Sequence, residues 1–181
     1  MLLKNKKIDL SILFIMIIVL FIGVISCSSD QENSTGQKPE KFSWLPYESA
    51  LIKSKVENMP TLLYFYSNNC GWCQKMESEN FGNKEIQDFL AKNFTSVRLN
   101  SDSSDIVTVD GEKMTERQLS TRVYEVRGYP SIWFLDNNNQ QIANLPGYVP
   151  TDTFLSILHY IGEGFYKEYT FAEYMELQQK S

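Results

Sequence analysis

The chain has 181 residues, a formal net charge of −5, 43% hydrophobic residues and 13% aromatic residues. This apolar content excludes an intrinsically disordered chain, and because no Lys/Arg-rich run follows the first seven residues, nucleic acid is not an expected partner. About 155 residues follow the apolar N-terminus, which is enough for one compact α/β domain.

Residues 1–41 differ in composition from the rest of the chain. A basic start precedes the apolar run Ser11–Val24, which is shorter than the roughly 20 residues that span a bilayer. The segment Val24–Cys27 resembles the lipobox of bacterial lipoproteins, which implies cleavage before Cys27 and lipid attachment to its sulfur. We therefore predict a signal peptide over residues 1–26, then a lipidated Cys27 and flexible tether over residues 27–41, on the periplasmic face of a bacterial membrane. An uncleaved anchor is the alternative, and it also places the domain outside the cytoplasm.

Residues 42–181 form the predicted domain. The sequence of its first half predicts one strand and three helices. Thr61–Ser67 follows Pro60 and is rich in β-forming residues, so we expect a buried strand there. Asn83 is a suitable N-cap for the helix that follows it. The helices expected in this half are Tyr47–Glu57, Gln74–Glu79 and Lys84–Asn93.

The second half predicts strands, a small β-excursion and further helices. The expected strands are Phe94–Asn100, Ser131–Asp136 and Gln141–Leu145, the last two joined by asparagines that tolerate positive φ. Ser101–Met114 interrupts this pattern around the tight turn Asp110-Gly111. The expected helices are Thr115–Tyr124, Thr153–Ile161 and Thr170–Gln179. The order of elements predicts an α/β fold with a central mixed β-sheet flanked by helices on both faces.

The segment Cys70-Gly71-Trp72-Cys73 lies between the first strand and the helix after it. Two cysteines at this spacing across a helix start are close enough to form a disulfide. The free N–H groups and the positive dipole end of the helix stabilise a thiolate at the first cysteine. Cys70 is therefore the predicted nucleophile that attacks a partner disulfide, and Cys73 is the thiol that resolves the mixed disulfide.

A metal site, haem attachment and a structural disulfide are the other functions of such a motif. A structural zinc site needs four ligands, and the soft or imidazole donors of the domain are Cys70, Cys73 and His159, the last expected to be a packed helix residue. Haem attachment needs a histidine at the position of Gln74. We therefore predict no metal, and no nucleotide cofactor because the chain has no GxGxxG motif. An inert structural disulfide stays open.

Thr61–Met76 resembles the active-site strand, motif and helix start of thioredoxins. The segment Gly128–Pro130 matches the position of the cis-proline that faces the motif in that fold. The resemblance implies the thioredoxin fold, a redox-active Cys70–Cys73 disulfide, and pairing of a partner peptide with the main chain at Tyr129, beside Pro130. An ordinary strand-initiating role for Pro130 is the alternative.

Three further segments resemble the SoxW-like periplasmic branch of thioredoxins, namely Ser101–Met114, Leu145–Tyr148 and residues 163–175. That branch is linked with keeping partner thiols reduced, and the C-terminal domain of the transmembrane conductor DsbD is a neighbouring group. The resemblance implies that the partners are exported protein thiols and disulfides and a membrane electron donor of the DsbD type. It also implies a small insertion, Ser101–Met114, before the helix that precedes Pro130.

The chain departs from the common thioredoxin pattern near the motif. Tyr64 stands where many thioredoxins carry a buried aspartate, and Trp72 stands where proline is common, exposed toward a partner. Glu77 lies one helical turn after Cys73, so its carboxylate is a candidate acceptor for the Cys73 proton. The DsbD-type domain has an acidic residue at the matching place, whereas a solvated Glu77 is the alternative. Packing in the core is expected for Tyr64, Trp44 and Trp133.

These features predict a membrane-anchored thiol–disulfide oxidoreductase that reduces disulfides of exported proteins through its CGWC dithiol. A non-catalytic, thioredoxin-like binding lipoprotein with a structural disulfide is the alternative. The direction of electron flow depends on a reduction potential that spans roughly 150 mV across this fold, and the SoxW-like resemblance favours the reductant.

Overall fold

The computed structural model describes residues 41–180. The predictions made for the signal peptide, for Cys27 and for the tether up to residue 40 lie outside the described residues. Within residues 41–180, no helix is both long and apolar enough to cross a membrane.

A four-stranded mixed sheet forms the centre of the domain, in the order β2-β1-β5-β6. The central strand β1 (Thr61–Tyr66) runs parallel to β2 (Thr95–Asn100) and antiparallel to β5 (Ser131–Leu135). The hairpin partner of β5 is the edge strand β6 (Gln141–Pro146). The predicted mixed sheet is confirmed, and each strand differs from the prediction by one residue at one end.

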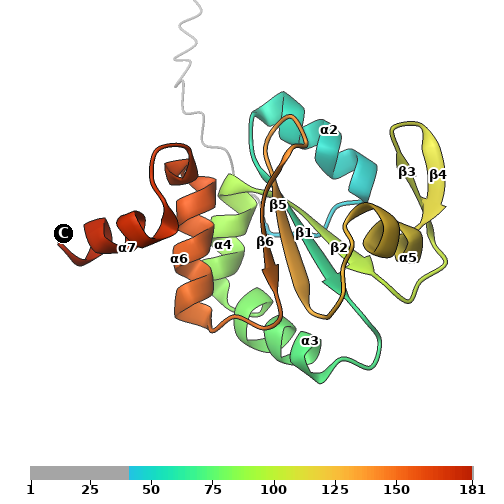
Figure 1. The fold of residues 1–181 in the computed structure, drawn as a ribbon, viewed down its shortest axis with the longest axis horizontal. Coiled ribbons are helices and arrows are strands. Elements are labelled where there is room, and N and C mark those ends of the chain that lie inside the picture. Colours follow the sequence, from blue (N-terminus) through green and yellow to red (C-terminus); the bar gives the residue numbers. More distant parts are fainter. Residues whose placement is uncertain (1–40, 181) are drawn as a thin grey trace, which may run out of the picture. The chain divides into compact units, whose positions relative to one another are not determined.

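Helices cover both faces of this sheet (Figure 1). One face is covered by α3 (Gly71–Met76), α4 (Lys84–Asn93) and α6 (Thr151–Gly162), and the other by α2 (Tyr47–Glu57) and the short α5 (Glu116–Gln118). The domain has two hydrophobic cores, one on each face of the sheet. The side chains of β1 contribute to both, because successive side chains of a strand point to opposite faces. Leu62 and Tyr64 pack with α3, α4 and α6, whereas Leu63 and Phe65 pack with α2. The predicted helices on both faces are therefore confirmed.

The predicted interruption after β2 is a β-hairpin of β3 (Ile106–Val109) and β4 (Glu112–Thr115). Asp110 and Gly111 form its turn with φ angles of 50° and 86°, the left-handed pair that a two-residue hairpin loop requires. Thr115 then caps α5, as predicted. The helix continues to Val123 as a π-helical turn, which the sequence pattern did not predict.

The helix after the cysteine motif also has a π-helical continuation. It begins at Gly71, three residues earlier than predicted, because Cys70 is its N-cap. Its π-helical turn spans Glu77–Phe81 and ends at Gly82, where a Cβ atom would lie 2.5 Å from the Ser78 carbonyl oxygen. The predicted break near Gly82 is thus confirmed, and the close Ser78 carbonyl oxygen explains why glycine occupies this position.

The C-terminal segments agree with the prediction apart from two details. The helix α6 starts at Thr151 instead of Thr153, because the Phe154 N–H already bonds the Pro150 carbonyl oxygen. A short 3₁₀ turn precedes α7 (Phe171–Gln179), which has the predicted capping box at Thr170.

The two tryptophans expected in the core are only partly buried. Trp44 packs against Tyr64 and Phe81, with ring centroids 6.0 Å and 4.9 Å away. Trp133 packs against Tyr124, at 5.5 Å. Each ring packs against the outside of one of the two cores.

Candidate active site

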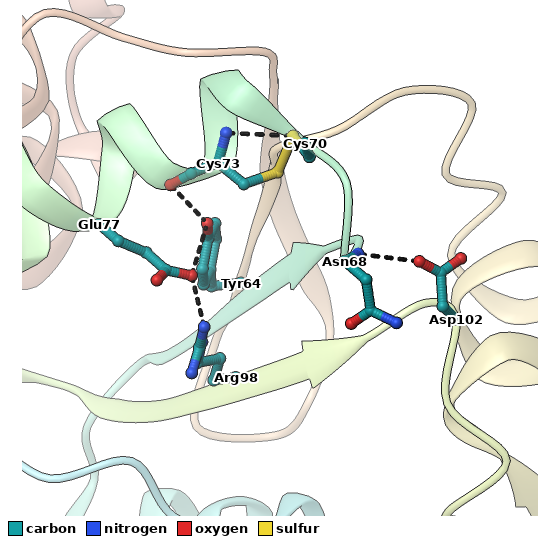
Figure 2. Close-up of a disulfide and its surroundings, with 7 residues drawn as sticks. All are labelled: Tyr64, Asn68, Cys70, Cys73, Glu77, Arg98 and Asp102. Carbon is teal, nitrogen blue, oxygen red and sulfur yellow. Dashed lines mark hydrogen bonds and ion pairs between the residues drawn. A yellow bond between two sulfur atoms is a disulfide. The ribbon is translucent and has the colours of Figure 1, made fainter.

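A disulfide joins Cys70 and Cys73 where β1 leads into α3 (Figure 2). The two Cα atoms are 5.2 Å apart, within the usual range for a bridge. Cys73 is only 2% exposed, whereas Cys70 is partly exposed. The geometry therefore distinguishes a reachable sulfur from a shielded one, which matches the attacking and resolving roles predicted for them.

The start of α3 is arranged to stabilise negative charge on Cys70. The Cys73 N–H lies 3.0 Å from Cys70 Sγ and donates to it. Cys70 is also the N-cap, so its sulfur lies at the positive end of the helix dipole. When the bridge is reduced, both effects favour the thiolate form of Cys70.

Pro130 lies at the same end of the sheet as the disulfide. The peptide bond between Tyr129 and Pro130 is cis, as predicted. Ser131, the next residue, pairs with Phe65 near the end of β1, just before the chain turns into the cysteine motif. The Gly147 N–H donates a hydrogen bond to the Pro130 carbonyl oxygen at 2.7 Å, which fixes the loop before β5 against the end of β6.

Trp72 is exposed beside the disulfide, as predicted, with 59% of its surface accessible. Its ring lies 5.6 Å from the ring of Tyr148, and the ammonium of Lys75 lies 4.6 Å from the Tyr148 centroid. The Tyr148 hydroxyl donates to Glu79. Sequence reasoning noted Tyr148 only as part of a family segment and missed its contact with Trp72.

Glu77 makes polar contacts on the sheet side of the helix (Figure 2). Arg98 Nη2 lies 2.5 Å from Glu77 Oε1, and the Tyr64 hydroxyl donates to the same oxygen at 3.4 Å. The Tyr64 hydroxyl is also 3.3 Å from the Cys73 carbonyl oxygen. Glu77 is thus linked to Cys73 through Tyr64, an arrangement that neither the proton-acceptor hypothesis nor the solvated alternative described.

Tyr64 is fully buried beneath this helix. Burial raises the pKa of Tyr64 well above its ordinary value, and the negative charge of Glu77 raises it further. Tyr64 therefore remains a protonated hydrogen-bond donor at neutral pH. Arg98, its neighbour across the β1–β2 pairing, stacks its guanidinium 4.1 Å from the Tyr66 ring centroid. Arg98 is a site residue that sequence reasoning missed.

The loop that enters the motif is fixed by polar contacts from the end of β2 and from the turn after it, and Figure 2 shows the contact with Asp102. The Asn68 N–H donates to Asp102 Oδ2 at 2.8 Å. The Asn100 side-chain amide donates to Asn68 Oδ1 at 2.9 Å. These contacts hold the turn before Cys70, and Asp102 had no distinguishing signal in the sequence.

The part of the chain that the structure describes, residues 41–180, contains no group of three or more His, Cys, Asp or Glu residues that could hold a metal ion. His159 lies on α6, where its Nδ1 is 2.9 Å from Glu163. A cavity of about 540 Å³ lies beside the loop before Pro130, and its lining includes neither cysteine; it is formed by Val123, Tyr124, Glu125, Val126, Arg127, Gly128, Ser131, Trp133, Gln141, Asn144 and Pro146.

Comparisons with known proteins agree with this architecture. Residues 47–162 match the model of a thioredoxin-like domain family. The disulfide bond reductase DsbH of Chlamydia pneumoniae is 29% identical over 146 residues, which cover 72% of this chain and 84% of that protein. A thioredoxin-fold protein from Helicobacter pylori matches with a TM-score of 0.57 at 25% identity, over 68% of this chain and 86% of its own. A thioredoxin from Thermus thermophilus gives a TM-score of 0.53 at 25% identity, over 66% and 85% respectively. The predicted thioredoxin fold is confirmed.

Proposed function

The chain belongs to the thioredoxin-like family, and from that premise we propose that this thiol–disulfide oxidoreductase works as a reductant of disulfides in exported proteins. The observation that carries the proposal is the asymmetric pair, with Cys70 partly exposed at a helix start and Cys73 buried behind it. An accessible, stabilised thiolate with a shielded second thiol is what two-step reduction of a partner disulfide requires.

The proposed reaction begins with the reduced dithiol. The Cys70 thiolate attacks one sulfur of the client disulfide, whose S–S bond breaks, and the released client thiolate takes a proton from solvent. Cys73 then loses its proton and attacks the Cys70 sulfur, so the mixed disulfide breaks and the second client thiolate leaves and is protonated. Two electrons pass to the client, and the Cys70–Cys73 disulfide forms. A thiol reductant must then restore the dithiol, and a membrane donor of the DsbD type is the proposed source.

We assign the removal of the Cys73 proton to the carboxylate of Glu77. The Tyr64 hydroxyl contacts both the Glu77 carboxylate and the Cys73 carbonyl oxygen, which links the carboxylate to the backbone of the second cysteine. A loss of the resolving step in Glu77→Gln, with attack by Cys70 unchanged, would support this role. Equal resolving rates in the variant and the wild type would refute it.

The reductant direction is supported by the likeness to DsbH, a protein named as a disulfide bond reductase. It also agrees with the resemblance to the SoxW-like branch. The test has two measurements, reduction of insulin by the full chain with a chemical thiol donor, and the reduction potential against glutathione. Turnover with a potential near that of thioredoxin, about −270 mV, is expected. A potential near −120 mV would make the protein an oxidant, and no turnover at all would favour the non-catalytic binding lipoprotein.

The client is proposed to lie across Trp72, Tyr129 and Pro130, beside the partly exposed Cys70. The contact between the Trp72 and Tyr148 rings extends this surface. Replacing Trp72 with alanine removes a large exposed aromatic surface, so we expect KM for a protein client to rise about tenfold, a loss of about 1.4 kcal/mol in binding. The rate with a small aromatic disulfide should change less than twofold, because such a substrate needs only the Cys70 sulfur.

The control for this prediction is Val56→Ala, which trims a side chain that is 79% exposed on α2, away from the motif. It should leave both substrates unaffected. Equal losses with the protein client and the small disulfide in Trp72→Ala would show that Trp72 acts on the chemistry and not on client binding.

The location outside the cytoplasm is also a proposal, based on the N-terminal sequence. A lipid on Cys27 would keep the reductase at the membrane surface, near its electron donor. Mass spectrometry of the mature chain tests this directly. Cleavage before a lipid-modified Cys27 is expected, and an intact Met1 would contradict it.

A further inference from the structure

The helix after the disulfide is joined to the sheet by a polar link through Tyr64 and Arg98. The Tyr64 hydroxyl has one proton and lies within reach of two acceptors, the Cys73 carbonyl oxygen at 3.3 Å and Glu77 Oε1 at 3.4 Å. The Glu77 N–H also donates to that carbonyl oxygen. The Tyr64 hydroxyl therefore joins the backbone of the buried cysteine to the carboxylate one turn later.

Arg98 holds the other side of the same carboxylate. Its Nη2 lies 2.5 Å from Glu77 Oε1, and both side chains are 35% exposed, so the pair is partly shielded from solvent. Arg98 is itself held in place, because it neighbours Tyr64 across the β1–β2 pairing and stacks on the Tyr66 ring. Both hydrogen bonds to the carboxylate use Oε1, which leaves Oε2 as the oxygen to receive a proton.

We propose that Tyr64 and Arg98 are positioning residues for the second step of disulfide exchange. Tyr64 holds the Glu77 carboxylate beside Cys73, and Arg98 neutralises its charge. The inference rests on the proposed function and extends it to residues that touch neither the sulfurs nor the client. It also assigns a role to a tyrosine in place of the carboxylate that many thioredoxins carry at this position.

The charges around Cys73 give Arg98 a defined electrostatic effect. The groups that face Glu77 are Tyr64 and Arg98, from β1 and β2. On the helix itself, Lys75 and Glu79 pair with each other at 3.9 Å. Without Arg98, the negative charge of Glu77 disfavours a thiolate at Cys73, so the pKa of the Cys73 thiol should rise.

The first experiment measures that pKa in the full-length chain. Cys73 is alkylated over a range of pH in a Cys70→Ser background, and its peptide is followed by mass spectrometry so that other cysteines do not interfere. Arg98→Met should raise the midpoint by about one pH unit, whereas Arg98→Lys, which keeps the positive charge, should leave the midpoint at the wild-type value. Arg127→Met, at an arginine that is 89% exposed, is the matched control and should have no effect.

The second experiment measures the resolving step in a single turnover of the reduced chain with a peptide disulfide, by acid quenching and mass spectrometry of the mixed disulfide. Tyr64→Phe and Glu77→Gln should each slow its decay about tenfold at pH 7. The double variant should be no slower, because both changes break one linkage. Tyr124→Phe, which removes a buried hydroxyl from the opposite core, should decay at the wild-type rate.

The outcomes separate this inference from the proposed function. If the wild type forms no mixed disulfide, both are wrong. If Cys70 attacks normally but Arg98→Met leaves the Cys73 midpoint unchanged and Tyr64→Phe leaves the decay rate unchanged, only the positioning role is wrong. Additive losses in the double variant would also refute the shared linkage. Arg98 is partly exposed, so Arg98→Met is expected to fold. The Cys73 midpoint in that variant therefore tests the positioning role even if Tyr64→Phe destabilises the core.

Discussion

Replacing Cys70 with serine is expected to abolish disulfide reduction, lowering insulin turnover at least about a thousandfold, to the level of the chemical thiol alone. Cys70 is the partly exposed sulfur, and the Cys73 N–H donates to it at the start of α3. Serine places a hydroxyl there that does not ionise near neutral pH, and Cys73, at 2% exposed, cannot reach a client in its place. Initial rates of insulin reduction measure the loss.

The complementary change, Cys73→Ser, should stop the reaction one step later. Cys70 still attacks, so a covalent complex with the client should accumulate on a non-reducing gel and disappear with dithiothreitol. Cys27→Ser is the matched control and should retain reductase activity, because it makes the same substitution at the cysteine outside the motif. Residual turnover in Cys70→Ser, or no trapped complex in Cys73→Ser, would contradict this assignment, and a complex trapped by Cys70→Ser instead would reverse the two roles.

The elements around this site could be predicted because their signals are local. The strand β1 follows Pro60 as a continuous apolar run, and a strand buried on both faces has that pattern. Asn83 caps α4 with its side chain, and Asp110-Gly111 forms the hairpin turn. Each of these depends on a few adjacent residues, so the sequence alone was sufficient.

The polar contacts of the site could not be predicted in the same way. Arg98 reaches Glu77 only because β1 and β2 pair in parallel with Tyr64 opposite Arg98. That register is decided by the packing of both cores, and no short segment of sequence encodes it. The contact of Tyr148 with Trp72 likewise depends on where the loop after β6 approaches α3.

The π-helical turn at Glu77–Phe81 is the other feature without a sequence signal. A π-helical turn widens the backbone by one residue and has no characteristic composition. Here it changes which side chains after Cys73 face the sheet, and it places Phe81 in the core, 5% exposed. Up to Glu77 the spacing is still α-helical, because the Glu77 N–H bonds the Cys73 carbonyl oxygen, so the π-helical turn shifts only the residues that follow Glu77.

Phe81→Ala should produce a large loss of stability while leaving both cysteines in place. The Phe81 ring packs against Tyr64, Trp44 and Phe154, with centroids 4.8, 4.9 and 5.8 Å away. It thereby joins the strand β1, the segment before α2 and the helix α6. Truncating a buried phenylalanine loses its apolar burial and leaves a cavity, so the free energy of unfolding should fall by about 3–5 kcal/mol.

Urea unfolding of the oxidised chain measures this change, because keeping the disulfide closed holds the constraint on the unfolded state constant. The midpoint concentration should fall while the slope stays the same. Ile52→Ala, at a side chain that is 67% exposed on α2, is the control and should change stability by less than about 0.5 kcal/mol. A loss below about 1 kcal/mol in Phe81→Ala would mean that the core closes around the truncated residue. If folded Phe81→Ala also lost the resolving step with attack by Cys70 intact, the packing that places Tyr64 would be part of how the second thiol is activated.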